Sequence, residues 1–485
     1  MAEVEEVLRG TSLEGAEILQ VSAVTGQGLE DLQLRLERIL EGAPAREDRG
    51  RPRLPVDRVF IISGFGTVVT GTLVDGSLKV GEEVELQPSG RRVRVRGLQQ
   101  HNRKVEQALP GSRVAANLVG VEKEDLRRGE VLGRPGTLRS TRRVDASVRV
   151  VEGSPRALRH GQHLLLHAGT AEVSARAIVL AADEIQPGGT GWVQLYLQQP
   201  VAVAAGDRFV LRLPSPAATI AGGVFADVDP RRHPRHDVAV RSSLERRAAG
   251  EVLQEELRKY PRGITEQGLL KATLADGVGV SKLEAKHAGQ WLFAPEAWTM
   301  IASKATRALE EYHRLHPLRG GMPREEMKSR LGLQSAVFGA VVVELANERV
   351  LTHLGGELAL PSHRVEIDPA SGGPAGRLLE ILGTKPFAPP SLPEAMRDAG
   401  ASADVVRALA QRGELVRLSD DVAFTRSAYE AAVELVREMV AVAGTVTVAS
   451  LRDRMGASRR PVLALLEYLD AQRITRRVGD ARLLR

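Results

Sequence analysis

The 485-residue sequence contains no cysteine, which excludes disulfide bonds and thiolate metal sites. Aromatic residues make up only 3% of it, which disfavours binding of single strands through bases stacked on aromatic rings. No run of about 18 apolar residues occurs, and the acidic start MAEVEEVLRG lacks the apolar core of a secretory signal. We therefore expect a cytoplasmic protein that does not cross a membrane.

The charge balance is slightly basic. The chain has 67 Lys and Arg against 61 Asp and Glu, a net charge of +6, and a pI near 9.7. This balance permits a polyanionic partner, and it fits a solvated arginine-rich surface equally well. The length predicts roughly three to five domains.

The stretch from Leu54 to Val84 is rich in β-branched residues and is interrupted by glycines at turn-like intervals. This composition predicts short strands joined by tight corners, as in a small closed β-barrel. Residues 57–73, DRVFIISGFGTVVTGTL, resemble the opening strands of the second domain of translational GTPases.

The segment before the barrel has the pattern of a strand, a loop and a helix. We predict a short helix over residues 2–9, a strand over residues 16–21 and an amphipathic helix over residues 29–40. The loop SAVTGQG between the last two resembles the final guanine-base loop of translational GTPases, which implies that Ser22 and Ala23 lie at the base. Taken alone, it is also a common strand-to-helix corner.

The sequence has no GxxxxGK[ST] phosphate loop, and neither a DxxG switch motif nor an NKxD motif precedes the barrel. We therefore expect residues 1–50 to be the remnant of a GTPase domain, docked on the barrels or on another chain. Members of the family of translational GTPases use GTP and Mg²⁺. We expect neither to be bound by this chain alone, and we assign no catalytic residue and no metal ligand.

Residues 51–137 complete the first predicted barrel. The strand at 91–100 alternates arginine with valine, which puts its arginines on one face. The segment VEKEDLRRG resembles that of selenocysteine-specific elongation factors, in which this barrel accepts the aminoacyl end of the tRNA. The resemblance implies a selenocysteine pocket at Asp57, Arg58 and Arg113, and an ordinary surface ion pair is the alternative. Arginines would select the anionic selenolate by charge, with Asp57 orienting Arg58.

Residues 138–229 predict a second β-barrel. Its expected strands lie near residues 144–150, 163–167, 172–179, 192–197 and 208–213. His160, His163 and His167 have no carboxylate at ligand spacing, so we interpret them as ordinary strand and loop residues.

A proline- and arginine-rich linker over residues 230–236 precedes a helical region. Three copies of a helix followed by a hairpin predict tandem winged helices. We place them at residues 237–301, 302–366, 367–431 and 432–485; the first is irregular and lacks a clear recognition helix.

The last winged helix carries the sharpest pattern. Ser458 is the predicted cap of a helix with an apolar stripe at Val462, Leu465, Leu466 and Leu469. Arg459 and Arg460 begin this helix, and Arg476, Arg477 and Arg482 surround a hairpin turn at residues 479–480. A solvated basic tail or a protein-binding module would show similar charge. The segment resembles the terminal unit of selenocysteine-specific elongation factors, which implies that Ser458 and these five arginines contact an mRNA hairpin.

We thus predict a multidomain α+β protein, in which the C-terminal remnant of an α/β GTPase domain precedes two β-barrels and tandem winged helices. The resemblance implies a monomeric elongation factor for selenocysteine incorporation. It would deliver selenocysteinyl-tRNA to the ribosome at UGA codons by binding an mRNA hairpin. The alternatives are an RNA-binding adaptor or decoy without GTPase activity and, less favoured because of the barrels, a winged-helix regulator that binds nucleic acid.

Overall fold

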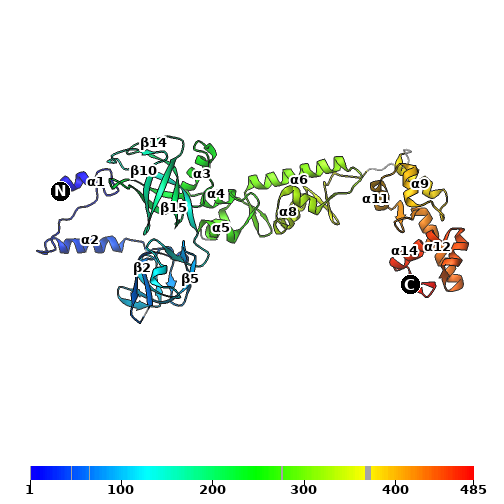
Figure 1. The fold of residues 1–485 in the computed structure, drawn as a ribbon, viewed down its shortest axis with the longest axis horizontal. Coiled ribbons are helices and arrows are strands. Elements are labelled where there is room, and N and C mark those ends of the chain that lie inside the picture. The colour runs from blue at the N-terminus through cyan, green and yellow to red at the C-terminus, as the bar shows by residue number, and fades with distance from the viewer. Residues whose placement is uncertain (1, 45, 65, 275–276, 366–372) are drawn as a thin grey trace. The chain divides into compact units, whose positions relative to one another are not determined.

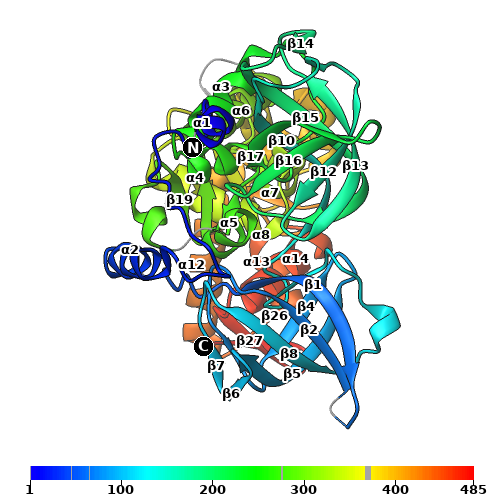
Figure 2. The same cartoon turned by 90° about the vertical axis from the view of Figure 1, so that its left-hand side faces the viewer.

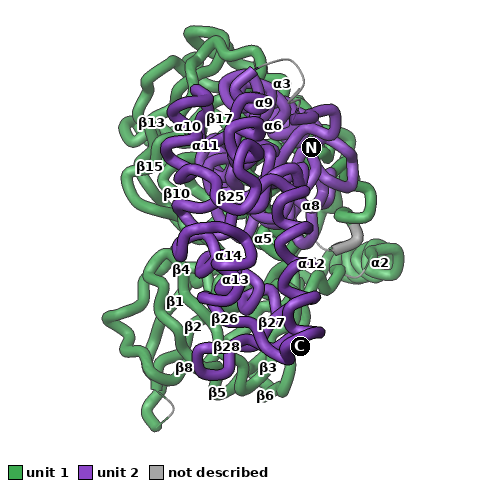
Figure 3. Tube along the Cα trace, turned by 90° about the vertical axis from the view of Figure 1, so that its right-hand side faces the viewer, with its two compact units in different colours: residues 1–285 green, residues 286–485 purple. Residues whose placement is uncertain are grey.

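The structure is a computed structural model that describes residues 2–44, 46–64, 66–274, 277–365 and 373–485 (Figure 1). It consists of two compact units, residues 1–285 and 286–485 (Figure 3).

The first unit begins with two helices that bury nothing. Helix α1 spans Ala2–Leu8 and helix α2 spans Leu29–Glu41, and neither has a buried residue. The strand predicted over residues 16–21 is wrong, because these residues form no strand. A strand needs a neighbour to accept its backbone hydrogen bonds, and an apolar run alone does not supply one. Most of the large apolar residues of this segment are exposed.

The first barrel is a ring of six strands with one further strand at its edge. The ring runs β4-β9-β1-β2-β8-β5 and closes through the pairing of β5 with β4, while β6 extends from β5. Its strands are β1 Arg53–Ile62, β2 Gly66–Thr72, β4 Glu83–Gln87, β5 Arg91–Gln100, β6 Arg103–Val105, β8 Arg113–Val119 and β9 Val131–Gly133. A separate pair, β3 Leu78–Lys79 and β7 Gln107–Ala108, and the 3₁₀ helix η1 Lys123–Asp125 complete the domain.

The alternation read from the sequence decides which side chains fill this barrel. In β5, Val93 and Val95 are buried while Arg92, Arg94 and Arg96 are exposed, as predicted. Each fully buried aliphatic side chain stabilises the fold by about 1.5–3 kcal/mol, so the valines and leucines facing inward hold the barrel closed.

The second barrel closes in the order β10-β15-β13-β12-β16-β17. Its strands are β10 Ser140–Val150, β12 His163–Ala168, β13 Ala171–Val179, β15 Thr190–Ala202, β16 Arg208–Leu213 and β17 Ala218–Asp227, with the small pair β11 Leu158–Arg159 and β14 Glu184–Ile185 beside them. All five strands predicted for this region are confirmed. Figure 2 shows the two barrels of the first unit side by side.

Two bonds from Arg53 to Asp207 join the barrels, at 2.7 and 2.9 Å. The guanidinium also donates to Asp75 at 2.6 Å and is largely buried. Burial alone would lower the pKa of Arg53, but Asp207 and Asp75 raise it, so the charge is retained.

The proline- and arginine-rich linker after the second barrel is attached to that barrel. Nε2 of His233 lies 3.0 Å from the carboxylate of Asp145 and 2.9 Å from the side-chain amide of Gln194. The side chains of His233 and Asp145 are both buried. Burial opposes the charged imidazole, but Asp145 raises the pKa of His233. Arg235 hydrogen-bonds Asp183 at 2.8 Å. The linker is therefore an ordered strap on the barrel.

Helices follow this strap in the first unit. They are α3 Val238–Ala248, α4 Val252–Arg258, α5 Glu266–Thr273 and the 3₁₀ helix η2 Gly277–Lys282, with the short strand β18 Ile264–Thr265 before α5. The place where a winged helix would have a recognition helix is occupied by η2, which agrees with the irregular pattern of the sequence here.

The second unit contains helices, each group of which ends in a hairpin. Its helices are α6 Pro295–Leu315, α7 Arg324–Leu331, α8 Ser335–Asn347, α9 Pro374–Gly383, α10 Leu392–Ala399, α11 Ala403–Gln411, α12 Arg426–Ala443, α13 Val448–Met455 and α14 Arg459–Ala471. Its strands are β19 Lys286–Ala288, β20 Trp291–Phe293, β21 Met322–Pro323, β22 Thr352–Leu354, β23 Glu357–Ala359, β24 Leu415–Arg417, β25 Ala423–Thr425, β26 Val446–Thr447, β27 Thr475–Val478 and β28 Ala481–Leu484.

Side-chain caps begin several of the short helices in this unit. Ser391 and Thr447 form capping boxes at α10 and α13, and Ser402 caps α11. Two groups end in three-stranded sheets, β21-β23-β22 and β26-β28-β27, and the group between them ends in the pair β24-β25. The predicted fold class, with two barrels followed by winged helices, is confirmed.

A glycine in β17 of the second barrel lies where its neighbours leave no room for a side chain. A Cβ on Gly223 would lie 2.6 Å from Cζ of Phe209 and against the carbonyl oxygen of Ser147, whereas one on Gly222 would meet only the carbonyl of Phe209, at 3.4 Å. We expect Gly223→Ala to destabilise the protein by about 1–3 kcal/mol through overpacking. Gly222→Ala is the matched control and should change it by about 0.5 kcal/mol or less. Urea unfolding of the two variants measures this, and equal stabilities would contradict the packing described.

Candidate functional site

A cluster of charged side chains on the first barrel begins at an irregularity in β1. The register between β1 and β2 shifts between Val56 and Arg58, so Asp57 is the additional residue of a β-bulge. Arg58 lies opposite Thr70 on β2, and Arg113 lies opposite Thr72 on the other side of the same strand. The three residues predicted for the selenocysteine pocket are therefore brought to one part of the barrel.

Asp57 forms its ion pair with Arg113. The guanidinium donates two hydrogen bonds to the carboxylate, at 2.7 and 3.2 Å, and the hydroxyl of Thr70 donates a third at 2.6 Å. Partial burial acts to raise the pKa of Asp57, but the bonds from Thr70 and Arg113 outweigh it and lower the pKa below its usual value. The carboxylate is therefore ionised at neutral pH.

The expectation that Asp57 orients Arg58 is wrong. Among the described residues, Asp57 has no hydrogen bond to Arg58, because Arg113 reaches the carboxylate across β2 first. Arg58 is exposed beside this pair. With two guanidinium groups and one carboxylate, the cluster carries a net positive charge and suits a small anion. The role of Thr70 could not be read from the sequence, since its only signal was a place in an alternating strand.

The predicted guanine-base loop is a closed turn. The backbone of Ser22 exchanges hydrogen bonds with Gln27 and Gly26, both at 2.9 Å, and its hydroxyl accepts from the N–H of Thr25 at 3.2 Å. A Cβ at Gly28 would collide with the carbonyl of Gln20, so the turn into α2 requires glycine. Ala23 is exposed at the tip of this turn.

The last helix of the chain presents positive charge at its beginning. The predicted stripe Val462, Leu465, Leu466 and Leu469 is fully buried in the core of the last winged helix. That packing leaves Arg459 and Arg460, the first two residues of α14, exposed. Arg460 pairs with Asp421, which lies between β24 and β25.

Ser458 occupies the N-cap position, but its side chain makes no capping hydrogen bond, contrary to the expectation. Pro461, the third residue of the helix, has no N–H to offer. The N–H groups of Arg459 and Arg460 and their guanidinium groups therefore combine with the positive end of the helix dipole. Such an arrangement suits a phosphate.

The hairpin after this helix turns at residues 479–480, as predicted. Arg476 and Arg477 are exposed on β27. Arg482 does not fit the predicted RNA contact, because it lies on the middle strand of the sheet and its side chain is only 3% exposed. Its Nε donates to Asp470 at 3.2 Å, and Asp470 also accepts from Thr475 at 2.6 Å. Arg482 therefore fixes the hairpin to α14 and is not presented to a partner.

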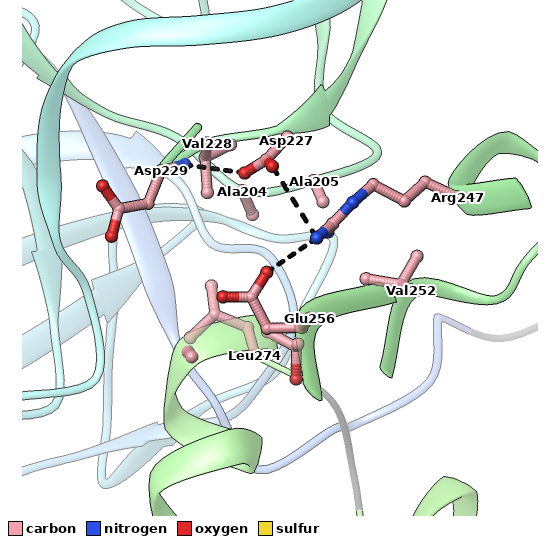
Figure 4. A pocket seen from close by; sticks show the side chains of 11 residues that line it. Ala204, Ala205, Asp227, Val228, Asp229, Arg247, Val252, Glu256 and Leu274 are labelled. Carbon is pink, nitrogen blue, oxygen red and sulfur yellow. Dashed lines mark hydrogen bonds and ion pairs between the residues drawn. The ribbon is translucent and has the colours of Figure 1, made fainter. Parts of the chain in front are cut away.

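A buried charged cluster joins β17 of the second barrel to α3 and α4 (Figure 4). Arg247 is 3.0 Å from Glu256 and 3.7 Å from Asp227, and Lys259 contacts the same two carboxylates at 2.9 and 2.7 Å. The adjoining cavities measure only about 20 and 90 Å³, so the cluster is a structural connection. Sequence reasoning missed it, because its residues come from three elements and form no motif.

Metal sites and membrane-spanning helices are two further kinds of feature that the described ranges could hold. No group of three or more His, Asp or Glu side chains there is arranged to hold a metal ion. No single helix in those ranges has both the length and the apolar character to cross a membrane; only the bent pair α7–α8 meets these criteria together.

Comparison with known proteins identifies the family. Four family models match parts of the chain: "Elongation factor Tu domain 2" at residues 66–133, "Selenocysteine-specific elongation factor, beta-barrel domain" at 145–232, and "Elongation factor SelB, winged helix" at both 306–360 and 438–484. The selenocysteine-specific elongation factor of Desulfomicrobium baculatum is 32% identical, over 100% of this chain and 79% of that protein. The chain belongs to the family of selenocysteine-specific elongation factors.

Further relatives agree in extent. The selenocysteine-specific elongation factor of Escherichia coli K12 is 27% identical over 100% of this chain and 78% of its own length. A crystal structure of bacterial selenocysteine-specific elongation factor EF-Sec shares the fold, with a TM-score of 0.63 and 22% identity over 100% of this chain and 78% of that one. Within this family assignment, Arg113 and Arg459 fall inside matched segments, while Asp57 and Arg58 precede the first of them.

We expect Arg247→Met to destabilise the first unit by about 3 kcal/mol, because two buried carboxylates would then share Lys259 alone. Arg262→Met is the matched control, since Arg262 is exposed in the same helical region. Thermal unfolding followed by circular dichroism measures the difference. A Tm for Arg247→Met equal to that of the control would contradict the structural role of the cluster.

Proposed function

We propose that this chain acts in translation elongation for selenocysteine incorporation, binding selenocysteinyl-tRNA and an mRNA hairpin at a UGA codon. Family membership over the whole length of the chain is the observation that carries this proposal. The two positively charged sites support it, because one lies on a barrel and the other on a terminal winged helix.

The barrel site would receive the selenocysteine. The selenol is largely ionised at neutral pH, whereas the hydroxyl of serine is neutral. Arg58 is exposed and Arg113 is held by Asp57, so an incoming selenolate would meet one exposed guanidinium and one that an ion pair positions. Charge separates the two aminoacyl groups where size would not. Thr70 acts as a positioning residue, because its hydroxyl holds the carboxylate that holds Arg113.

The last winged helix would bind the RNA hairpin. The first turn of α14, with Arg459 and Arg460, would face the phosphates of the loop, and Arg476 and Arg477 on the wing would contact the backbone of the stem. Because the protein has few aromatic residues, most of the affinity would come from phosphate contacts. Because the side chain of Arg482 is buried, we leave it out of the proposed RNA-binding surface.

The remaining expectations belong to the same proposal. Delivery would take place on the ribosome in the cytoplasm, by a monomer, and would depend on GTP and Mg²⁺ as in the family. The domains would be the barrels at residues 51–137 and 138–229 and the winged helices at residues 237–301, 302–366, 367–431 and 432–485. Ser22 and Ala23 would lie in the guanine-base loop.

The double substitution Arg58→Ala with Arg113→Ala should abolish discrimination between selenocysteinyl-tRNA and seryl-tRNA, because both positive groups that recognise the selenolate are lost. Arg103→Ala, which removes an exposed arginine elsewhere on the barrel, is the control. Equilibrium binding of the two aminoacyl-tRNAs to each variant is the measurement. Unchanged discrimination in the double variant would refute the pocket.

Replacing Arg459 and Arg460 together by alanine should weaken binding of an RNA hairpin about tenfold or more and flatten its salt dependence by about one to two units of slope. The probe is a fluorescein-labelled RNA hairpin selected from a pool with a randomised loop. Binding is followed by fluorescence anisotropy at salt concentrations from about 0.05 to about 0.2 M. Arg426→Ala, on an exposed ion pair with Glu430, is the control. An unaltered slope in the double variant would sink the assignment.

A further inference from the structure

A turn in the preceding winged helix lies at the beginning of α14. This turn, residues 418–422, joins β24 to β25, and its Asp421 pairs with Arg460 of α14. The pair links two winged helices within the second unit, and it involves one of the two arginines to which the proposed function assigns RNA contact. The following argument rests on that proposed function.

The position of Asp421 is fixed by the packing around it. Leu418 and Val422, on either side of it in the turn, pack into the hydrophobic core that contains Leu465 and Leu466 of the last winged helix. The carbonyl oxygen of Asp421 accepts a hydrogen bond from the N–H of Leu392 at 2.8 Å.

The hydroxyl of Ser419 closes the turn from inside. It accepts from the N–H groups of Asp421 and Val422, at 3.3 and 3.2 Å. The backbone that carries Asp421 is therefore fixed before the first turn of α14, which brings its carboxylate to Arg460.

The start of α14 has the properties of an anion site, and one of its two arginines already pairs with a carboxylate. Its cap side chain makes no hydrogen bond, its first two residues are arginines, and the helix dipole adds positive potential. A carboxylate there satisfies the same charge that a phosphate would. The side chains of Arg460 and Asp421 are 53% and 56% exposed, so solvent screens the pair and an incoming phosphate can displace the carboxylate.

We propose that Asp421 is an internal counter-ion that competes with RNA phosphate for Arg460 and thereby lowers the RNA affinity of the last winged helix. A hairpin must displace this carboxylate to use Arg460, while Arg459 stays available beside it. Removing the negative charge of Asp421 should therefore strengthen RNA binding, although the residue itself touches no RNA.

The test is Asp421→Asn in the full chain, with the fluorescein-labelled hairpin selected from a randomised-loop pool as the probe. We expect binding about two- to fivefold tighter at 0.1 M salt, the range set by an exposed ion pair. The salt dependence should steepen by at most roughly 0.7–0.9, because in the unsubstituted chain the release of the Asp421 carboxylate offsets the phosphate that Arg460 neutralises.

The turn offers a matched control. Asp420 neighbours Asp421, pairs with Arg417 at 2.6 Å and has a fully exposed side chain, so Asp420→Asn removes the same charge without changing Arg460. The change in log Kd for the hairpin that Asp420→Asn causes should be less than half of the change that Asp421→Asn causes. In an Arg460→Ala background, Asp421→Asn should have no effect on affinity, because the group for which it competes is absent.

Three results would overturn the proposal: unchanged or weaker binding by Asp421→Asn, equal gains from the two Asp→Asn variants, or a gain that persists in the Arg460→Ala background. Failure of the proposed function looks different, since hairpin binding would then be insensitive to Arg459→Ala as well. Weaker binding by Arg459→Ala together with an unchanged Asp421→Asn variant would reject the counter-ion alone.

Discussion

Pairing between arginine and carboxylate decides what each part of this protein can do. Arg53 joins the two barrels through Asp207, Arg247 joins the second barrel to the helices that follow, and Arg482 ties the last hairpin to α14. Each of these guanidinium groups is largely buried, where a partner is needed to offset the cost of desolvation. The protein thus uses a share of its positive charge to hold its domains together.

Many other arginines are exposed, and two of them lie at the sites described above. Arg58 stands beside the Asp57–Arg113 pair on the first barrel, and Arg459 begins α14. Both positions depend on features with no charge of their own: a β-bulge in the first case and a buried apolar stripe in the second. The first barrel and the last winged helix thus present these cations at places that the packing of their neighbours fixes.

The alternation of residues in β5 and the stripe of α14 were correctly predicted, because burial of apolar side chains follows local periodicity. Contacts between distant residues were not. The sequence suggested that Asp57 pairs with its neighbour Arg58, whereas the bulge turns it toward Arg113, 56 residues away. Its place beside the hairpin turn put Arg482 among the arginines expected to contact RNA, and an apolar run predicted a strand at residues 16–21, where none forms. Tertiary pairing, which no local pattern encodes, accounts for these differences.

We expect carboxylate pairing to separate structural arginines from those available to RNA. Modification of the chain with phenylglyoxal, which reacts with accessible guanidinium groups, tests it residue by residue when the products are mapped by mass spectrometry with and without the selected RNA hairpin. We expect Arg459 and Arg476 to react in the protein alone and to be protected by the hairpin, while Arg53, Arg247 and Arg482 stay unreactive in both samples. Reaction of Arg482 at the rate of Arg459, or no protection of Arg459 by the hairpin, would contradict it.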